Sequence, residues 1–440
     1  MTRSAEDRDA QSTVFEGFRL ITGDGGPAID DAVLIVRDGI VVAAGPRDQA
    51  DFPNDVTCSV SLTGRTVMPT IVNPHGHIGY YKGAGTDKAN FNRANVIDHL
   101  RRFVYHGVSV IQSLGTDRDD IELAVRDEQR ARTLDDPELA TLFSASNGLA
   151  APTPGAENGG AFFAPDVIRE VSTPEEARAT VRDIVAKNPD VIKFWVDDRN
   201  GTKQKLRPEV YAAIIGEAHR HGKKAIAHIY DLDDAKGVIR AGADGTAHMV
   251  REPGPDEELL TLLRASGAFV FTSMSIQRGF QQDLRWLDDP LLAETVGAEA
   301  RDTIREQFSR IPVEMKETLN RGYQVLEASL QKYVDAGVTV LMSADTGVIT
   351  QFPGFAEHRE IEAMVDAGMP ALEAIKASTL LPAQMLGLTD RGSLEPGMRA
   401  DFIVLTADPL DAIANTRKIE SVYIAGVAVD RERMRKTFLV

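Results

Sequence analysis

The sequence is poor in cysteine and in positive charge. Cys58 is the single cysteine among 440 residues, so an intramolecular disulfide is excluded, and we expect a buried or idle thiol rather than a nucleophile. Lysine and arginine together number 49 against 66 aspartates and glutamates, which gives a formal net charge of −17 at pH 7. Because nucleic acids and anionic lipid surfaces are bound through basic patches, this balance argues against both as partners.

Long hydrophobic runs are also missing. No window approaches the roughly 18 consecutive apolar residues of a membrane-spanning helix. The hydrophobic content of 43% and the charged content of 26% are ordinary for a globular enzyme. Residues 1–13 are polar and lack the apolar segment of a secretory signal. We therefore expect a soluble, cytoplasmic protein with no membrane partner.

Both ends of the chain are patterned as short strands. From residue 14 to residue 67, short apolar or alternating runs are broken by Gly, Asp and Pro, and "RDG" at 37–39 is the clearest hairpin turn. The closing runs "GSLEPGMRADFIVLT" and "KIESVYIAGVAVD" have the same texture. Because neither end has enough apolar surface to fold alone, we predict that residues 1–66 and 393–440 pair into one small β-sandwich.

Residues 67–392 have a different texture, in which apolar runs alternate with helical periodicity. Eight runs are typical of strands, at 66–73, 107–115, 140–146, 190–196, 223–229, 244–250, 267–273 and 337–345. Most are followed by an amphipathic segment such as "RPEVYAAIIGEAHRHG". This count predicts an α/β protein with a (β/α)8 TIM barrel, whose catalytic groups stand at the carboxyl ends of the strands.

Two connections in this region are unusually long. The Gly/Pro-rich stretch 147–166 follows the third predicted strand and is typical of an active-site loop. The stretch 273–330 follows the seventh strand and predicts inserted helices that could cover the site.

Polar residues gather where five of the predicted strands end. They are His75 and His77 after the first, Lys193 in the fourth, His228 and His248 ending the fifth and sixth, and Asp345 ending the eighth. Side chains at i and i+2 of a strand point the same way, so His75 and His77 can bind one cation, with Gly76 leaving the gap between them clear. The constellation predicts a metal site, because packing alone does not place these residue types at one end of five strands.

Lys193 and Asp345 have other interpretations. Lys193 interrupts the apolar run "VIKFW", and its ammonium could snorkel or form a salt bridge. If it is buried without a partner, its pKa falls and the neutral amine can act chemically. Asp345 could cap the helix that follows.

The remaining histidines serve as a control. We interpret His99, His106, His219 and His221 as solvent-facing or capping, since they lie in helical segments or before turns. His358 follows the eighth strand, where it could line the pocket.

The order His-x-His, Lys, His, His, Asp resembles the metal-dependent amidohydrolase superfamily, in its imidazolonepropionase-like and prolidase-like branch. The closing stretch "AGMPALEAIKASTLLPAQMLGL" followed by "GSLEPGMRADFIVL" is similar to the way such barrels return to the sandwich. The resemblance covers nearly the whole chain. It implies two divalent metal ions, most often zinc, and a tendency to form homo-oligomers.

The resemblance also assigns roles to the strand-end residues. It implies that His75, His77 and Asp345 hold the buried metal and that His228 and His248 hold the more exposed one. Lys193 would bridge the two as N6-carboxylysine, a carbamate formed with carbon dioxide. Asp345 would take a proton from the metal-bound water and deliver it to the leaving nitrogen. Tyr230 resembles the tyrosine that reaches toward the substrate carbonyl, although structural packing is an equal alternative for it.

Two positions depart from the pattern of the superfamily. Asn73 stands where an aspartate is usual two residues before the first histidine, and "AHM" at 247–249 stands where "EHG" is usual. Neither departure removes a ligand, and a one-metal site stays an alternative.

The predicted function is hydrolysis of an amide-type carbon–nitrogen bond in a small molecule: an N-acyl amino acid, dipeptide, carbamate, urea or cyclic amide. The same site could serve a lactonase, an esterase or a deaminase. A catalytically inactive barrel with an assembly role is disfavoured, because such relatives tend to lose metal ligands and this chain retains all six positions.

Aromatic residues of two loops predict a partly aromatic substrate pocket. They and their polar neighbours are Tyr80, Tyr81, Phe162, Phe163, Gln277, Arg278, Phe280 and Trp286. Arg278 or Arg251 could pair with a substrate carboxylate, and each could equally form a surface ion pair.

Overall fold

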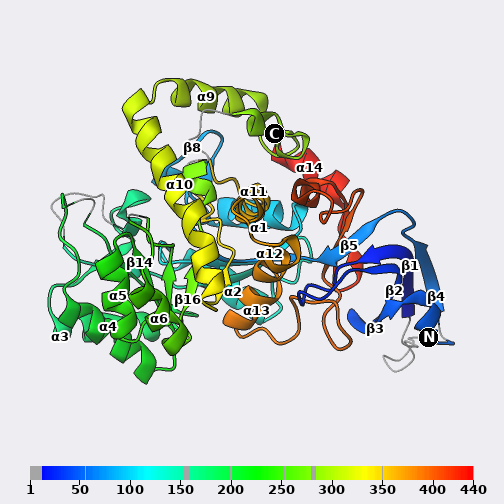
Figure 1. Cartoon of the computed structure of the whole chain (residues 1–440), viewed down its shortest axis with the longest axis horizontal. Coiled ribbons are helices and arrows are strands. Elements are labelled where there is room, and N and C mark those ends of the chain that lie inside the picture. The colour runs from blue at the N-terminus through cyan, green and yellow to red at the C-terminus, as the bar shows by residue number, and fades with distance from the viewer. Residues whose placement is uncertain are drawn as a thin grey trace.

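The strands of the two chain ends form one sheet (Figure 1). The computed structural model of the chain describes residues 12–54, 56–152, 159–198, 201–251, 253–278, 284–348 and 350–439. The strands of the terminal sheet are β1 (Ser12–Leu20), β2 (Ile29–Arg37), β3 (Ile40–Pro46), β4 (Val56–Ser61), β5 (Thr66–Pro69), β18 (Phe402–Leu405), β19 (Ile419–Ile424) and β20 (Val427–Ala428). Their order is β20-β19-β18-β5-β1-β2-β3, with β4 paired to β1.

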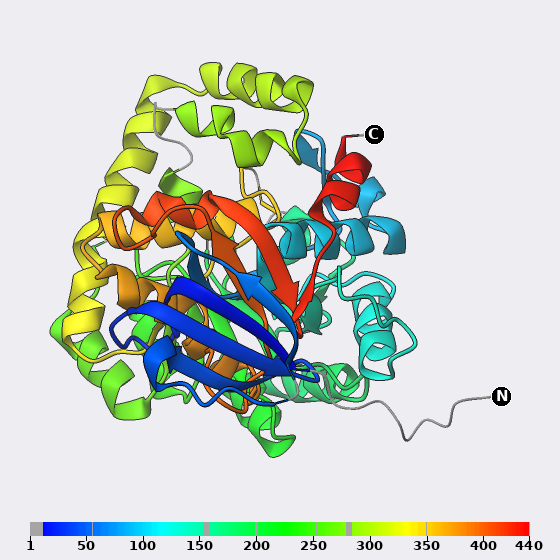
Figure 2. The same cartoon turned by 90° about the vertical axis from the view of Figure 1, so that its right-hand side faces the viewer.

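The two ends meet at the antiparallel pair β18 and β5, where Ile403 lies opposite Met68. Figure 2 shows the strands from both ends side by side. Phe15 of β1 packs edge-on against Phe402 of β18, with ring centroids 5.1 Å apart. The predicted pairing of the ends is therefore present, while its two-layer sandwich form stays a prediction. Cys58, on β4, is exposed rather than buried, with its thiol free.

The middle of the chain supplies two parallel sheets. One has the order β10-β9-β6 and the other the order β12-β11-β13-β14-β15-β16-β17. The strands are β6 (Ile71–Gly76), β9 (Val108–Ser113), β10 (Thr141–Ser144), β11 (Gly148–Ala150), β12 (Ile168–Glu170), β13 (Ile192–Val196), β14 (Ala225–Ile229), β15 (Gly245–Ala247), β16 (Phe269–Phe271) and β17 (Val340–Leu341). A parallel bridge between Gly76 and Thr346 joins the sheets at one edge. At the other edge the Asp190 N–H donates to the Ser144 carbonyl at 2.9 Å.

The prediction of one strand over residues 66–73 was wrong, because two strands of different sheets share this stretch. Its residues up to Pro69 belong to the terminal sheet as β5, and β6 begins at Ile71. The Thr70 N–H donates to the Asp401 carbonyl of the terminal segment, whereas the Ile71 N–H donates to the Gly107 carbonyl beside β9. The chain therefore passes from one sheet to the other at this peptide. The division of the chain at residues 66 and 393 stays a prediction.

Helices follow most of the parallel strands and cover them (Figure 1). They are α1 (Arg93–Tyr105), α2 (Ile121–Arg130), α3 (Pro174–Val185), α4 (Pro208–Arg220), α5 (Leu232–Arg240), α6 (Glu257–Ser266), α11 (Phe355–Asp366), α12 (Ala371–Ser378), α13 (Leu380–Met385) and the terminal α14 (Arg431–Phe438). None of these helices, nor any other in the described ranges, is long and apolar enough to cross a membrane.

The long segment after β16 is helical, as predicted, within its described residues. It contains α7 (Ser275–Arg278), the 3-10 turn η4 (Arg285–Asp288), α8 (Pro290–Ala293), α9 (Ala298–Ser309) and α10 (Val313–Asp335). Figure 1 shows α9 along the upper edge of the molecule, with α10 descending from it.

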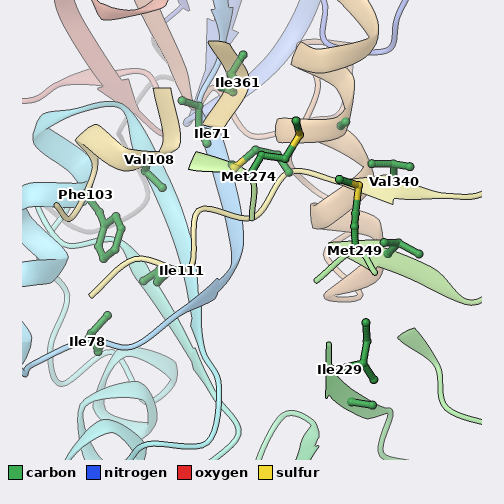
Figure 3. Packing of buried hydrophobic residues seen from close by; sticks show 14 of the residues in the cluster. Ile71, Ile78, Phe103, Val108, Ile111, Ile229, Met249, Met274, Val340 and Ile361 are labelled. Atoms are coloured by element: carbon green, nitrogen blue, oxygen red, sulfur yellow. The ribbon is translucent and has the colours of Figure 1, made fainter. Parts of the chain in front are cut away.

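One large hydrophobic cluster fills the space between the parallel strands and the helices. Figure 3 shows part of it, including Ile71 of β6, Val108 of β9 and Ile361 of α11, each fully buried. Close packing of this kind leaves little freedom to the strands. Polar side chains at the strand ends are therefore held in fixed relative positions.

Candidate metal centre

His75 and His77, at the end of β6, face Asp345 in the turn after β17. The Nε2 atoms of both rings lie 3.2 Å from Asp345 Oδ1. One ligand atom from each of the three residues can be chosen so that all lie within 4.8 Å of one another, and all three residues are buried. Two imidazoles and a carboxylate at this spacing are a ligand set for a divalent transition metal.

The backbone brings the turn after β17 against the end of β6. The His77 N–H donates to the Thr346 carbonyl at 2.6 Å. Gly347 has φ +105°, and a Cβ added there would lie 1.9 Å from the His77 carbonyl oxygen. Asp345 itself has φ +49°, a left-handed conformation that aspartate tolerates better than most residues. A glycine at 347 is therefore required for Asp345 to reach the two histidines.

Hydroxyl groups orient the two rings. His77 Nδ1 lies 3.0 Å from Thr116 Oγ1, and His75 Nδ1 lies 3.2 Å from Ser343 Oγ. Each bond leaves the Nε2 atom directed at Asp345, as is usual for metal-binding histidines, whose second nitrogen is held by a neighbouring polar group. Thr116 and Ser343 were not among the residues selected from the sequence.

Lys193, on β13, is fully buried. Its Nζ has no hydrogen-bond partner and no ion pair with any residue in the described part of the chain, and it lies 5.1 Å from the centre of the Trp195 ring. Burial lowers its pKa to about 7, against the opposing effect of Asp345. A substantial fraction of the amine is therefore neutral near pH 7, and the alternatives of a snorkelling or salt-bridged lysine do not describe this side chain.

His248 and His228 extend the cluster. His248 Nε2 lies 3.9 Å from Asp345 Oδ2, and its ring centroid lies 5.3 Å from that of His75. The His228 ring follows at 4.7 Å from His248, with its Nε2 3.2 Å from Asp197 Oδ2. The four imidazoles therefore form one continuous group. The buried Asp197, which was not predicted from the sequence, lies at the edge of this group.

The protonation states suit metal ions. Burial holds the pKa values of His75 and His248 well below the ordinary value, so both rings are neutral. Burial alone would raise the pKa of Asp345, but the adjacent His75 and His77 outweigh it and keep this carboxyl ionised. Within the described residues, Lys193 Nζ and His248 Nδ1 have no hydrogen-bond partner, and the 3.2 Å contact of His75 Nε2 with Asp345 Oδ1 does not have hydrogen-bond geometry. Buried polar atoms without partners are costly, so these residues fit a group that would coordinate them.

The unusual Asn73 has a structural explanation. Its side-chain oxygen accepts from the His75 N–H at 3.0 Å, and its amide nitrogen donates to Glu357 Oε1 at 2.5 Å and to Thr346 Oγ1 at 3.2 Å. Burial raises the pKa of Glu357 to about 7. An ionised aspartate at 73 could not donate to this glutamate and would repel it, whereas the asparagine links the two strand ends.

The aromatic residues divide into two groups. Phe163 lies beside the metal centre, with its ring centroid 4.6 Å from His77 and 5.2 Å from Tyr80. The Tyr80 hydroxyl donates to the Thr116 carbonyl at 2.7 Å, so its ring is locked in place. Tyr81 instead packs edge-on against Phe352, and Phe162 is exposed.

The other predicted substrate-binding residues lie elsewhere. The Arg251 guanidinium is 5.1 Å from the centre of the Tyr230 ring, past the end of β14. Arg278 forms ion pairs with Glu362 and Asp366 of α11. No described contact links Arg278 to the metal cluster, and Phe280 lies outside the described residues. The substrate-binding roles of Tyr80, Tyr230, Phe163 and Arg278 stay predictions.

The prediction for the control histidines was wrong at His99. His99 is buried, accepts from the Gly79 N–H at Nδ1 and donates from Nε2 to the Tyr81 carbonyl. His106 is also fully buried, but it is the C-terminal cap of α1, as predicted, and its Nδ1 lies 2.8 Å from the Arg102 carbonyl oxygen. His358, on α11, directs its Nε2 at the His106 carbonyl, 2.8 Å away, and not at the metal cluster.

The sequence is similar to a known protein family and to known enzymes. The profile of the amidohydrolase family matches residues 66–429. Imidazolonepropionase from Deinococcus radiodurans is 25% identical over 413 residues, which cover 90% of this chain and 92% of that protein.

Solved structures agree at the level of the fold. A Xaa-Pro dipeptidase with bound methionine in its active site has a TM-score of 0.75 and 20% identity, covering 95% of this chain and 99% of that one. Ochratoxinase from A. niger has a TM-score of 0.73 and 21% identity, covering 95% of each chain. These likenesses indicate a TIM-barrel fold with mixed α/β content.

Proposed function

The chain belongs to the amidohydrolase family and is a hydrolase of carbon–nitrogen bonds, and from this premise we propose that it cleaves an amide-type bond of a small molecule at a binuclear metal centre. The main support for the proposal is that the side chains of His75, His77 and Asp345 lie together, beside the buried Lys193, whose Nζ has no hydrogen-bond partner. The architecture proposed with it is a closed (β/α)8 barrel and a small β-sandwich from both chain ends. The bridge from Gly76 to Thr346 and the hydrogen bond from Asp190 to Ser144 support this closure.

The proposed ligands divide into two sets. His75, His77 and Asp345 would hold one divalent ion, most simply zinc, and His228 and His248 would hold the other. Lys193 would join the two sets as N6-carboxylysine, formed with carbon dioxide, because its amine is buried, has no described partner and has a pKa of about 7. When bound, the metals would lower the pKa of a shared water and polarise the scissile carbonyl.

Asp345 is the proposed proton carrier. Its carboxylate is ionised and its Oδ2 faces His248 at 3.9 Å, so it can accept a proton as the water oxygen attacks the carbonyl carbon. It then delivers that proton to the leaving nitrogen. A carbon–oxygen bond forms and the carbon–nitrogen bond breaks. An amide gives a carboxylic acid and an amine, whereas a carbamate or urea gives an amine and a carbonic or carbamic acid that loses carbon dioxide.

Substrate contacts are assigned by position. Tyr230 supplies a hydroxyl past the end of β14 that would donate to the substrate carbonyl oxygen. Tyr80 and Phe163 form an aromatic wall beside His77, which would exclude water from one side of the reacting group.

The test is a substrate panel with separate readouts for amine and acid. Metal-loaded protein is incubated with N-acyl amino acids, dipeptides, carbamates, ureas and cyclic amides, and with lactones, esters and adenine as competing classes. Release of both an acid and an amine from a member of the amide group supports the proposal. Turnover confined to lactones and esters, or ammonia release from adenine alone, would replace it with a lactonase, esterase or deaminase.

A further inference from the structure

A second site with unusual electrostatics lies outside the metal centre. A cavity of about 460 Å³ is lined by residues of α7, η4, α11 and the 3-10 turn η5 (Ile413–Arg417). Four arginine side chains contribute to its lining, against three carboxylates. The residues that line it include none of the metal ligands proposed above.

Arg359, on α11, is the central residue of this cavity. It is 4% exposed, and its guanidinium lies 3.9 Å from the centre of the Trp286 ring, so one face is covered. Its Nη1 is buried without a hydrogen-bond partner, and no ion pair joins it to a carboxylate in the described ranges. Burial and the nearby Arg278 lower its pKa to about 9, so it stays protonated at pH 7 with its charge poorly compensated.

The carboxylates of the cavity are committed elsewhere. Arg417 binds Asp289 at 2.9 Å and Glu362 at 2.5 Å, and Glu362 also reaches Arg278 at 3.5 Å. Asp288 binds Arg305, which lies on α9. Each of these acidic groups already has a basic partner and none forms an ion pair with Arg359, although the negative charges of Glu362 and of the neighbouring Glu360 compensate it in part.

Two further donors are unpartnered at the same place. Arg278 Nη1 and Trp286 Nε1 are buried and have no hydrogen-bond partner among the described residues, although both residues line the cavity. Together with Arg359 Nη1 they are three N–H donors without an acceptor. A cavity of this kind is complementary to an acceptor-rich anion, and a planar guanidinium matches the oxygens of carboxylate and phosphate groups.

We propose that this cavity binds the oxyanion group of a small molecule, a phosphate or a carboxylate, through Arg359, Arg278 and Trp286. Phe355, which stacks near Trp286 with ring centroids 6.4 Å apart, supplies an apolar wall for the rest of the ligand. The bound anion would connect the inserted segment after β16 with α11 and with η5 of the terminal region. Binding would therefore stabilise the native arrangement of three segments that are far apart in the sequence.

The test measures thermal unfolding and binding at constant ionic strength. Potassium phosphate and sodium acetate are the two probes, and potassium chloride replaces them in the reference samples. We expect phosphate, acetate or both to raise the Tm above the chloride reference, and a response to only one identifies the oxyanion class. Isothermal titration gives the dissociation constant of the effective anion.

Variants separate a built site from general charge effects. Arg359→Met should abolish the shift, and Trp286→Phe, which keeps an aromatic ring but removes the N–H, should weaken binding by about 10-fold. Arg310→Met is the matched control, since Arg310 is 73% exposed on the same inserted segment. If Arg359→Met fails to fold, Trp286→Phe decides the question by itself. No shift beyond chloride, an equal shift in Arg359→Met, or unchanged binding in Trp286→Phe would overturn the proposal.

Discussion

Two buried regions of this molecule leave polar atoms without partners, and they do so with opposite chemistry. In the metal centre the unpartnered atoms belong to neutral imidazoles and to the lysine amine, beside an ionised aspartate. In the arginine cavity they are N–H groups of guanidinium and indole. The first set offers electron pairs and suits a cation, whereas the second offers hydrogens and suits an anion. The kind of atom left unpartnered therefore indicates the charge of the missing ligand.

The network around Glu357 contrasts with both at one of its two carboxylate oxygens, since Glu357 Oε2 has no hydrogen-bond partner among the described residues. It is equally buried, but Asn73 and Thr346 donate to Glu357 Oε1 within the protein. Such a network needs no ligand at that atom, and its role is to hold the ends of β6 and β17 together. Deeply buried polar groups are therefore not all binding sites in this chain.

The largest expected effect concerns Asp345. Asp345→Asn keeps the shape of the side chain but removes the proton acceptor, so kcat/KM on the substrate found in the panel should fall about 10³-fold or more. Asp302→Asn, at a side chain 71% exposed on α9, is the matched control and should keep full activity. The phosphate or acetate response of the arginine cavity should survive in Asp345→Asn, since the two regions are separate. Comparable activity in the two variants would remove Asp345 from the proposed mechanism.

The second effect concerns the backbone beneath the metal centre. Gly347→Ala should destabilise the fold by about 3 kcal/mol for two reasons. The new Cβ would collide with the His77 carbonyl oxygen, and residue 347 has a positive φ that alanine adopts only with strain. Urea unfolding measures the change. Gly216→Ala, in α4 with open space around its Cβ, should instead leave stability unchanged or raise it slightly. A Gly347→Ala protein as stable as its parent would contradict the close approach of these two turns.

The third prediction concerns the pH dependence of stability that Glu357 causes. The pKa of Glu357 is about 7 in the folded state, above the unfolded value of 4.5, so the folded state binds more protons. The free energy of unfolding therefore falls as the pH rises from 4.5 to 7. The loss is at most about 3 kcal/mol for this group. Glu357→Gln should remove it, so the difference in unfolding free energy between variant and parent should grow in favour of the variant between pH 4.5 and 7. A constant difference across this range would show that Glu357 does not titrate there.

The smallest effect concerns the hydroxyl that orients His77. Thr116→Ala removes the partner of His77 Nδ1 and should weaken metal binding by about 10-fold, as competition with a chelating dye would measure. Thr133→Ala removes an exposed hydroxyl that bonds only the Glu128 carbonyl, and it should have no effect. Equal metal affinity in both variants would mean that Thr116 does not position the ring.

Most of the site residues predicted from the sequence were identified from their immediate neighbours in the chain. The placement of His75 and His77 on one side follows from the geometry of a strand, and the apolar neighbours of Lys193 indicated its burial. Thr116, Ser343, Asp197 and Glu357 could not be selected in this way, because their partners come from other parts of the chain. Asn73 and Glu357, for example, are 284 positions apart and meet only where β6 lies beside the turn after β17.

The wrong predictions for the strand at 66–73 and for His99 have the same origin. The apolar run from Thr66 to Asn73 does not indicate that its first half pairs with β18 in another sheet. Helical periodicity likewise does not distinguish a polar residue at the surface from one that bridges a buried loop, as His99 does between Gly79 and Tyr81. Both features depend on tertiary contacts that a local pattern does not contain.

The most direct test of the metal centre is the number of metal ions per chain. Protein grown with added zinc and bicarbonate is measured by elemental analysis, together with Lys193→Ala and, as a control, Lys187→Ala at an exposed lysine. We predict close to two ions in the parent and in Lys187→Ala, and clearly fewer in Lys193→Ala. One ion that is unaffected by the loss of Lys193 would exclude the bridging carbamate, and no metal in the parent would contradict the proposed catalytic centre altogether.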